Sequence, residues 1–129
     1  MLILDNSIEL IEIAKKVRAN AYAPYSKFLV GAALMSTSGK IYTGCNMENA
    51  TFGATICAER AALCAGIAAG ERTFSAIAIV ADTKNISPCG ICRQQLSEFS
   101  PTMYVYCASI DGTAKSYKLN ELLPNAFIL

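Results

Sequence analysis

The counts of cysteine and histidine constrain this chain more than any other feature. Its 129 residues contain six cysteines and no histidine. Without an imidazole the chain can build neither a Ser-His-Asp triad nor a Cys-His nucleophile pair. The chain is long enough to form its own core and begins without the basic region of a signal peptide, so we do not expect a disulfide framework. Any zinc site must then be built from thiolates and carboxylates.

The composition narrows the class of protein further. The chain is 53% hydrophobic and only 16% charged, against about 25% charged residues in ordinary soluble domains. A net charge of +1 disfavours binding to nucleic acid. The longest mostly apolar run, residues 61–70, is half of the roughly 20 residues that a membrane span needs. We expect a cytoplasmic protein whose low charge indicates burial between subunits.

Hydrophobic periodicity and turn residues predict one domain over residues 1–129. Helices are expected over residues 7–21, 57–69 and 89–99 and in a last turn at 120–123, and strands over 29–36, 41–45, 75–81, 102–109 and 116–119. Asn6 or Ser7 is expected to cap the first helix, and Asn120 the last turn. The order combines a hairpin with β-α-β crossovers, which predicts a three-layer α/β/α sandwich around a mixed sheet.

Three cysteines lie at the predicted starts of two helices. Cys57 opens the second helix, and Cys89 and Cys92 open the third. Backbone N–H groups and the positive end of the helix dipole favour the thiolate there. Three thiolates would leave the fourth position of a tetrahedral zinc site for water. Glu59 lies two residues from a ligand, where it can contact that water without binding the metal.

Other uses of these thiols remain open at this point. The pair Cys89 and Cys92 is also compatible with a thiol-redox couple, or with half of a structural zinc site in a non-catalytic module. A structural site needs a fourth sulfur. We interpret Cys64 and Cys107 as small core residues, which leaves Cys45 as the alternative fourth ligand.

The sequence resembles the small three-cysteine class of cytidine deaminases, from about Tyr22 to Phe127. Three cysteine ligands, a non-ligand Glu and a P-C-x-x-C run form the signature of zinc nucleobase deaminases, and all are present. Six stretches in the family order carry the resemblance: Ala23-Pro24-Tyr25-Ser26-Lys27-Phe28, Val30-Gly31-Ala32-Ala33, Gly44-Cys45-Asn46-Met47-Glu48-Asn49-Ala50, Cys57-Ala58-Glu59-Arg60, Pro88-Cys89-Gly90-Ile91-Cys92-Arg93-Gln94 and Leu122-Leu123-Pro124.

The resemblance implies hydrolytic deamination of cytidine and deoxycytidine, a reaction of pyrimidine salvage. It implies one Zn²⁺ per chain on Cys57, Cys89 and Cys92, with Cys45 outside the ligand set. Zinc would lower the pKa of its water, and Glu59 would carry a proton from that water to N3 of the ring while hydroxide attacks C4.

The same resemblance implies the substrate contacts and the assembly. Asn46 and Glu48 would hold the ribose hydroxyls, the main chain at Ala58 would contact the base, and Phe28 would pack beside the nucleoside. A homotetramer with shared active sites is implied as well, in which Phe127 reaches the substrate of a neighbouring subunit.

Each of these side chains also has a plainer interpretation. Phe28 could be a core residue, Asn46 a turn or cap residue, Glu48 a solvated loop charge and Arg60 a surface charge. For Arg60 we favour a hydrogen bond to the ligand sulfurs, because three thiolates on Zn²⁺ leave a net charge of −1 that makes bound water harder to ionise.

One position departs from the family pattern, and one related activity remains as an alternative. Phe52 stands where many relatives have Tyr, so any contact through that hydroxyl is absent. A deaminase of another small aminopyrimidine nucleoside, of the blasticidin S type, would keep the zinc motifs. The run Asn46-Met47-Glu48-Asn49 favours a ribose-bearing substrate over that alternative.

Overall fold

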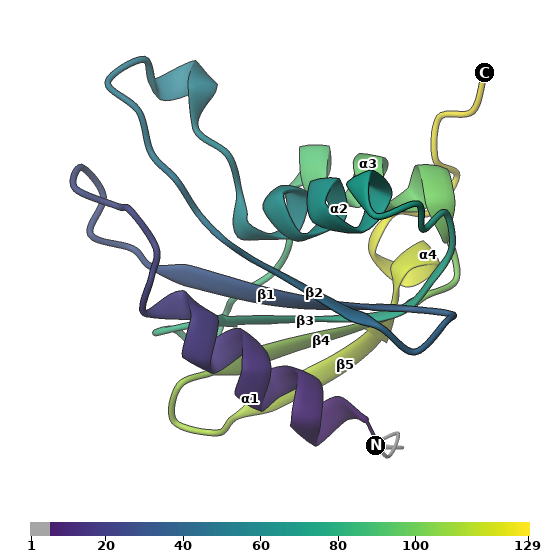
Figure 1. Cartoon of the computed structure of the whole chain (residues 1–129), viewed down its shortest axis with the longest axis horizontal. Helices are drawn as coiled ribbons and strands as arrows, with labels where there is room; N and C mark the ends of the chain where they lie inside the picture. The colour runs from purple at the N-terminus through teal and green to yellow at the C-terminus, as the bar shows by residue number, and fades with distance from the viewer. Residues whose placement is uncertain (1–5) are drawn as a thin grey trace.

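A five-stranded mixed sheet organises the described part of this computed structural model, residues 6–129. The elements are α1 (Ser7–Arg18), β1 (Val30–Ser36), β2 (Ile41–Cys45), the 3-10 helix η1 (Phe52–Ala54), α2 (Ala58–Ala68), β3 (Phe74–Ala81), α3 (Gly90–Phe99), β4 (Tyr104–Ser109), β5 (Ala114–Lys118) and α4 (Leu119–Leu122). The strand order is β2-β1-β3-β4-β5, with only β3 and β4 parallel. Helix α1 covers one face and α2 and α3 the other, so the predicted three-layer sandwich is confirmed (Figure 1).

The two central strands are almost entirely buried because both faces of the sheet are covered. Strands β1 and β3 each have one residue that is not buried, whereas the edge strands β2 and β5 remain half-exposed. Alternate side chains of a strand point to opposite faces. In β3, Ile77 and Ile79 pack toward α2 and α3, while Ala76 and Ala78 pack toward α1.

Helix α2 lies directly on β2 at Gly44. A Cβ at Gly44 would collide with the Ala58 carbonyl oxygen and the Ala62 amide nitrogen of the helix. Only glycine permits this approach of helix to strand. The contact places the N-terminus of α2, and with it Cys57, beside the end of β2.

One edge of the sheet collects the loops that matter for function. Val30 at the start of β1 pairs with Ala81 at the end of β3, and Gly31 pairs with Cys45 at the end of β2. The segments before β1, after β2 and after β3 therefore emerge together. Ligands of α/β proteins commonly bind outside the carboxyl ends of strands.

The first helix ends earlier than its apolar pattern predicts. It stops at Arg18 instead of Ala21, because the next N–H groups form tighter turn hydrogen bonds and Tyr22 N–H donates to the Asn46 carbonyl. Asn6 occupies the N-cap position, but its side chain makes no capping bond and donates to Met35 Sδ instead.

The C-terminal elements also differ by a residue or two. Strand β5 begins at Ala114 instead of Ser116, in register with β4. Helix α4 begins at Leu119, so Asn120 is not its cap. The Glu121 carboxylate accepts a hydrogen bond from the Lys118 N–H at 2.7 Å and supports this start. The segment between β2 and α2 contains the short helix η1.

The helices of residues 6–129 are short. None of them combines the length and the apolar character that crossing a membrane requires.

Candidate metal centre

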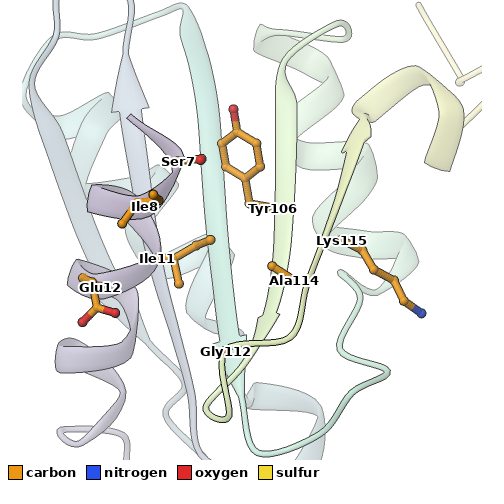
Figure 2. A pocket seen from close by; sticks show the side chains of 8 residues that line it. All are labelled: Ser7, Ile8, Ile11, Glu12, Tyr106, Gly112, Ala114 and Lys115. Atoms are coloured by element: carbon orange, nitrogen blue, oxygen red, sulfur yellow. The ribbon is translucent and has the colours of Figure 1, made fainter. Parts of the chain in front are cut away.

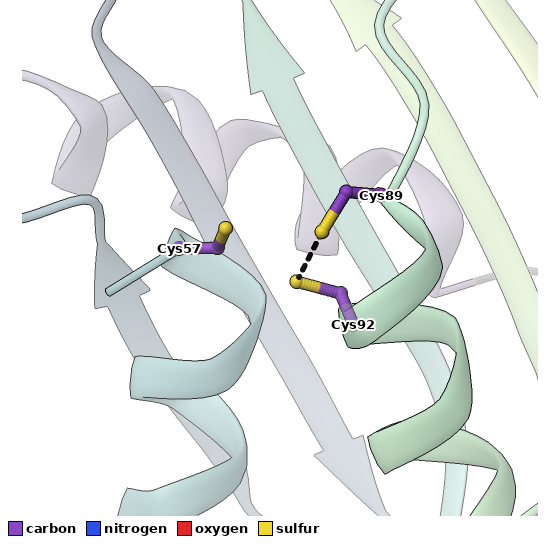
Figure 3. Close-up of side chains that lie close together, drawn as sticks. All are labelled: Cys57, Cys89 and Cys92. Atoms are coloured by element: carbon purple, nitrogen blue, oxygen red, sulfur yellow. Dashed lines mark hydrogen bonds between the residues drawn. The ribbon is translucent and has the colours of Figure 1, made fainter. Parts of the chain in front are cut away.

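Cys57, Cys89 and Cys92 come together at the N-termini of α2 and α3 (Figure 3). Cys57 and Cys89 are the N-cap residues of the two helices, and Cys92 lies in the first turn of α3. Their three Sγ atoms lie within 4.8 Å of one another, and Cys89 and Cys92 are 3.5 Å apart. Neither N-cap thiol makes a capping hydrogen bond to the backbone of its helix, so both remain available to a shared ligand.

The protonation of these thiols is coupled. A hydrogen bond from the Cys92 thiol, supported by the Arg60 guanidinium, lowers the pKa of Cys57 to about 5. The same hydrogen bond and burial raise the pKa of Cys92. A thiolate with two further sulfurs in reach is the donor set of a zinc site with one open position. The residues present therefore fit Zn²⁺.

The other three cysteines stand apart from this group. Cys45 is not part of the three-thiol cluster found among the described residues. Cys107 is buried inside β4, as expected, and burial raises its pKa to about 12. The core interpretation of Cys64 is wrong, because Cys64 is exposed on α2, whose buried face carries Ala62 and Leu63.

Glu59 is placed in the first turn of α2 with its side chain 5% exposed. Burial penalises its charged form and raises the pKa of the carboxyl to about 7. The residue lines the same cavity as Cys57 and Cys89. A carboxyl group thus stands beside the thiols without belonging to the cluster.

Arg60 extends from α2 toward Cys57. Its Nη2 donates to the Thr55 carbonyl at 2.9 Å and to Cys57 Sγ at 3.7 Å. Its Nε is buried with no hydrogen-bond partner in the described chain. A fixed cation therefore stands against the sulfur cluster.

A cavity of about 250 Å³ opens beside the thiols. It is lined by Ser26, Phe28, Val30, Asn46, Glu48, Thr55, Cys57, Ala58, Glu59, Ile86, Ser87 and Cys89. The structure thus brings Phe28, Asn46, Glu48 and Ala58 to one cavity with Glu59. Phe28 is 40% exposed, which excludes a purely core role.

Phe127 does not line this cavity. It is 70% exposed near the C-terminus, where Gln94 Nε2 of α3 donates to its carbonyl at 3.0 Å. Within one subunit, the structure does not bring Phe127 to the other predicted substrate contacts.

The Asn46 side chain is 8% exposed and holds the start of β1. Its Oδ1 accepts from the Val30 N–H and its Nδ2 donates to the Phe28 carbonyl, both at 2.8 Å. The structure thus confirms the turn role that the sequence allowed for Asn46. The same hydrogen bonds also fix Phe28 at the cavity. The second N–H of the amide remains for another acceptor.

Glu48 organises the loop at Tyr25 and Ser26, beside the cavity. Its Oε1 accepts from the N–H groups of Tyr25 and Ser26 at 2.9 and 3.1 Å, and its Oε2 accepts from the Ser26 hydroxyl. The hydroxyl bond chiefly lowers the pKa of the carboxyl, with help from both N–H groups. Glu48 is therefore an ionised acceptor beside the cavity.

The comparisons with known proteins agree with this geometry. The model of the "Cytidine and deoxycytidylate deaminase zinc-binding region" matches residues 5–108. The chain is 48% identical to a cytidine deaminase of Sporosarcina psychrophila over 121 residues, which cover 92% of this chain and 89% of that protein. The chain belongs to this deaminase family.

Solved structures of the family share the fold. The crystal structure of cytidine deaminase from Burkholderia pseudomallei has a TM-score of 0.91 and 48% identity, over 94% of this chain and 98% of that one. That from Mycobacterium tuberculosis has a TM-score of 0.82 and 36% identity, over 98% of this chain and 100% of that one. The family is zinc-binding, so this deaminase uses zinc, and its three-cysteine cluster could hold the ion.

The sequence did not reveal several polar neighbours of the site. Ser26, the partner of Glu48, lies 22 residues away in the chain, and no periodicity links two loops. The position of Ser87 just before Pro88 and Cys89 could have indicated that it lies near the site. A single serine, however, forms no motif that predicts its role.

A second hollow lies on the opposite face of the sheet (Figure 2). About 210 Å³ of space separates α1 from the β4–β5 hairpin, lined by Ser7, Ile8, Ile11, Glu12, Tyr106, Gly112, Ala114 and Lys115. Tyr106 is 2% exposed, and its hydroxyl has no partner in the described chain. The thiols and Glu59 lie on the other side of the sheet, so the deaminase chemistry does not reach this hollow.

The placement of the six cysteines predicts which substitutions remove zinc. Cys57→Ser and Cys89→Ser should each lose most of the bound metal, because an alcohol is a poor replacement for a thiolate ligand. Cys45→Ser and Cys107→Ser, which leave the cluster intact, should keep one zinc per chain. Metal analysis of the purified variants measures this. If Cys45→Ser loses zinc as completely as Cys89→Ser, the site has four sulfur ligands and no open position.

Proposed function

We propose that this chain hydrolyses free cytidine and 2′-deoxycytidine to uridine and 2′-deoxyuridine with release of ammonia, in pyrimidine salvage. Deamination of cytidine by a zinc-dependent hydrolase follows from membership of the family. The choice of a free nucleoside rests on one observation. The cavity beside the thiols is lined by Glu59 and also by the polar pair Asn46 and Glu48.

The zinc site and Glu59 have different tasks at the reacting carbon: the site serves to activate water, and Glu59 transfers protons. Cys57, Cys89 and Cys92 hold the ion, and the chemistry expected of zinc, once bound, is acidification of a water molecule near neutral pH. Glu59 takes a proton at its carboxylate and delivers it to N3 of the pyrimidine. It then helps to protonate the departing ammonia. Its burial keeps bulk water from competing for these protons.

Arg60 offsets the charge of the sulfur cluster. Three thiolates and Zn²⁺ sum to −1, which opposes ionisation of water. The guanidinium 3.7 Å from Cys57 Sγ withdraws negative charge from that sulfur. Arg60 acts here as a positioning residue, because it does not line the cavity.

The polar side chains of Asn46 and Glu48 select the sugar. Glu48, ionised and fixed by Ser26, accepts a hydrogen bond from a ribose hydroxyl, and the free N–H of Asn46 donates to another. Phe28 packs beside the nucleoside, and the main chain at Ala58 contacts the base. A carboxylate at this place repels a nearby phosphate, which disfavours nucleotides within a polynucleotide.

We extend the proposal to the organisation of the enzyme. Residues 1–129 form one deaminase domain, supported by the one five-stranded sheet of the described residues, beside which the loops and helix starts with the site residues lie. Six free cysteines support a reducing compartment, the cytoplasm. A blasticidin S-type substrate remains the second candidate, because it would use the same zinc and Glu59. A purely structural zinc module would need no buried carboxyl such as Glu59.

Large apolar side chains on the surface support a homotetramer with shared active sites. The exposed set includes Tyr25 and Phe52, whose rings meet edge to face at 5.7 Å beside the cavity, and Phe127. Apolar clusters of this kind mark interaction surfaces. In the assembly, Phe127 reaches the substrate of a neighbouring subunit.

Glu59→Gln should keep zinc and fold but lose nearly all turnover. The loss should exceed the roughly 10²–10⁴-fold typical of one proton transfer, because one carboxylate serves several transfers and an amide serves none. Loss of cytidine absorbance gives kcat, and metal analysis gives zinc content. Glu9→Gln, on α1 across the sheet, is the control and should remain fully active. Near-normal kcat for Glu59→Gln would exclude this mechanism.

Glu48→Gln should lower kcat/KM for cytidine by roughly 10–100-fold, the cost of losing a hydrogen bond to a charged group. Cytosine, which has no ribose, should lose little. Glu71→Gln is the matched control, since it changes another carboxylate that accepts from a serine hydroxyl but does not line the cavity. The wild type should act poorly on cytosine and on a short single-stranded oligonucleotide. Equal values for cytidine and the oligonucleotide, or equal losses in Glu71→Gln and Glu48→Gln, would contradict the ribose role.

Phe127→Ala should raise KM for cytidine and leave zinc content unchanged, because the ring contacts substrate only across the interface. Steady-state kinetics measures the effect on KM, and light scattering measures the oligomeric state. Ile8→Ala, which trims another exposed apolar side chain on α1, is the control. A wild-type chain that is a fully active monomer would rule out shared sites.

A further inference from the structure

Arg93 makes an unusual set of contacts beside the metal centre. Its Nε donates to the Pro88 carbonyl at 2.7 Å, its Nη2 to the Ser87 hydroxyl at 2.8 Å, and its Nη1 to the Leu122 carbonyl at 2.6 Å. All three nitrogens of one guanidinium therefore hold main-chain or hydroxyl oxygens. Two of the acceptors directly precede the zinc ligand Cys89.

The segment held by Arg93 has no regular structure, although Pro88 is buried and Ile86 packs against the core. Residues 82–89 form no helix or strand, and Cys89 is exposed at the end of this loop. Cys92, by contrast, is buried within the first turn of α3. The relative position of the two sulfurs thus depends on how the loop enters the helix. Arg93, one turn further along α3, reaches back to that entry.

The third contact ties the same point to the C-terminal part of the chain. The Leu122 carbonyl lies in the last turn of α4, where a helix leaves its carbonyls without internal partners. The guanidinium therefore bridges the ligand loop, α3 and α4. A lysine amine cannot reproduce this bridge, because it lacks the rigid fork of five donors.

We propose that Arg93 is a positioning residue of the metal centre, which fixes Cys89 relative to Cys92 through its bridge from Ser87 and Pro88 to Leu122. This inference rests on the proposed zinc-dependent deamination, in which these cysteines hold the ion. Arg93 does not line the cavity, so its effect passes through the ligand loop and not through substrate. Residues that orient metal ligands typically change metal affinity about 10–100-fold when substituted.

Release of zinc to a chromogenic chelator tests the role directly. Arg93→Gln, loaded with one zinc per chain, should release the metal about 10–100-fold faster than the wild type. Arg93→Lys should fall between the two, since it keeps the charge and loses the bridge. When zinc is saturating, Arg93→Gln should lower kcat and leave KM for cytidine close to the wild-type value.

Arg72→Gln is the matched control. Arg72 also donates twice to main-chain carbonyls, of Ile67 and Glu71, but at the end of α2 opposite Cys57. It should release zinc at the wild-type rate. If Arg72→Gln releases zinc as fast as Arg93→Gln, general loosening explains the effect and the positioning role is wrong.

Two further outcomes separate this inference from the proposed function. Wild-type release rates in both Arg93 variants would overturn the positioning role while deamination by the wild type still stands. A wild-type protein that binds zinc but does not deaminate cytidine would overturn the proposed function, and faster release from Arg93→Gln would still support the bridge. If Arg93→Gln does not fold, Arg93→Lys decides: wild-type release from it shows that charge alone suffices and overturns the bridge.

Discussion

The close contact of α2 with β2 at Gly44 is the constraint on which the metal centre depends. Because no side chain separates helix from strand there, the N-terminus of α2 is brought to the edge where β2 and β3 end. The segment after β3 leads at that edge into α3, whose N-terminus carries the other two thiols. The sulfurs meet although Cys57 and Cys89 are far apart in sequence, since the sheet register sets both helix starts. A larger residue at Gly44 would move one ligand relative to the other two.

The charges around the sulfurs follow from the same arrangement. Two helix N-termini point positive dipole ends at the cluster, which favours thiolates over thiols. Arg60 adds a full positive charge beside Cys57, while Glu59 is buried and its raised pKa lets it exchange protons near neutral pH. The site thus combines thiolates that keep a metal with a carboxyl that takes up and gives up protons. The start of α2 supplies one thiol, the carboxyl and the guanidinium, and the start of α3 supplies the other two thiols.

Local features of this protein could be predicted from its sequence, and long-range contacts could not. The helices, the strands and the three-layer architecture follow from periodicity. The thiol cluster follows from the helix-start positions of its members only together with the resemblance to the deaminases. Residue boundaries shifted where a distant partner intervened, as when Tyr22 joins Asn46 and ends α1 early. The core interpretation of Cys64 fails because residues 61–68 of α2 contain no charged side chain that would mark the exposed face. Contacts such as Glu48 with Ser26 or Arg93 with Leu122 join loops whose sequences carry no periodic signal.

The polar residues of the cavity also stabilise its walls, so the cavity is ordered before substrate binds. Asn46 holds the segment of Phe28, and Glu48 holds Tyr25 and Ser26. Their positions are therefore set before a nucleoside arrives, so less ordering entropy is lost on binding. In the proposed reaction these residues serve both the loops and the substrate, so removing one acceptor would disturb both. Preorganisation of this kind suits that reaction, because the role proposed for Glu59 needs the base at a fixed distance and misplaced reacting atoms slow chemistry steeply.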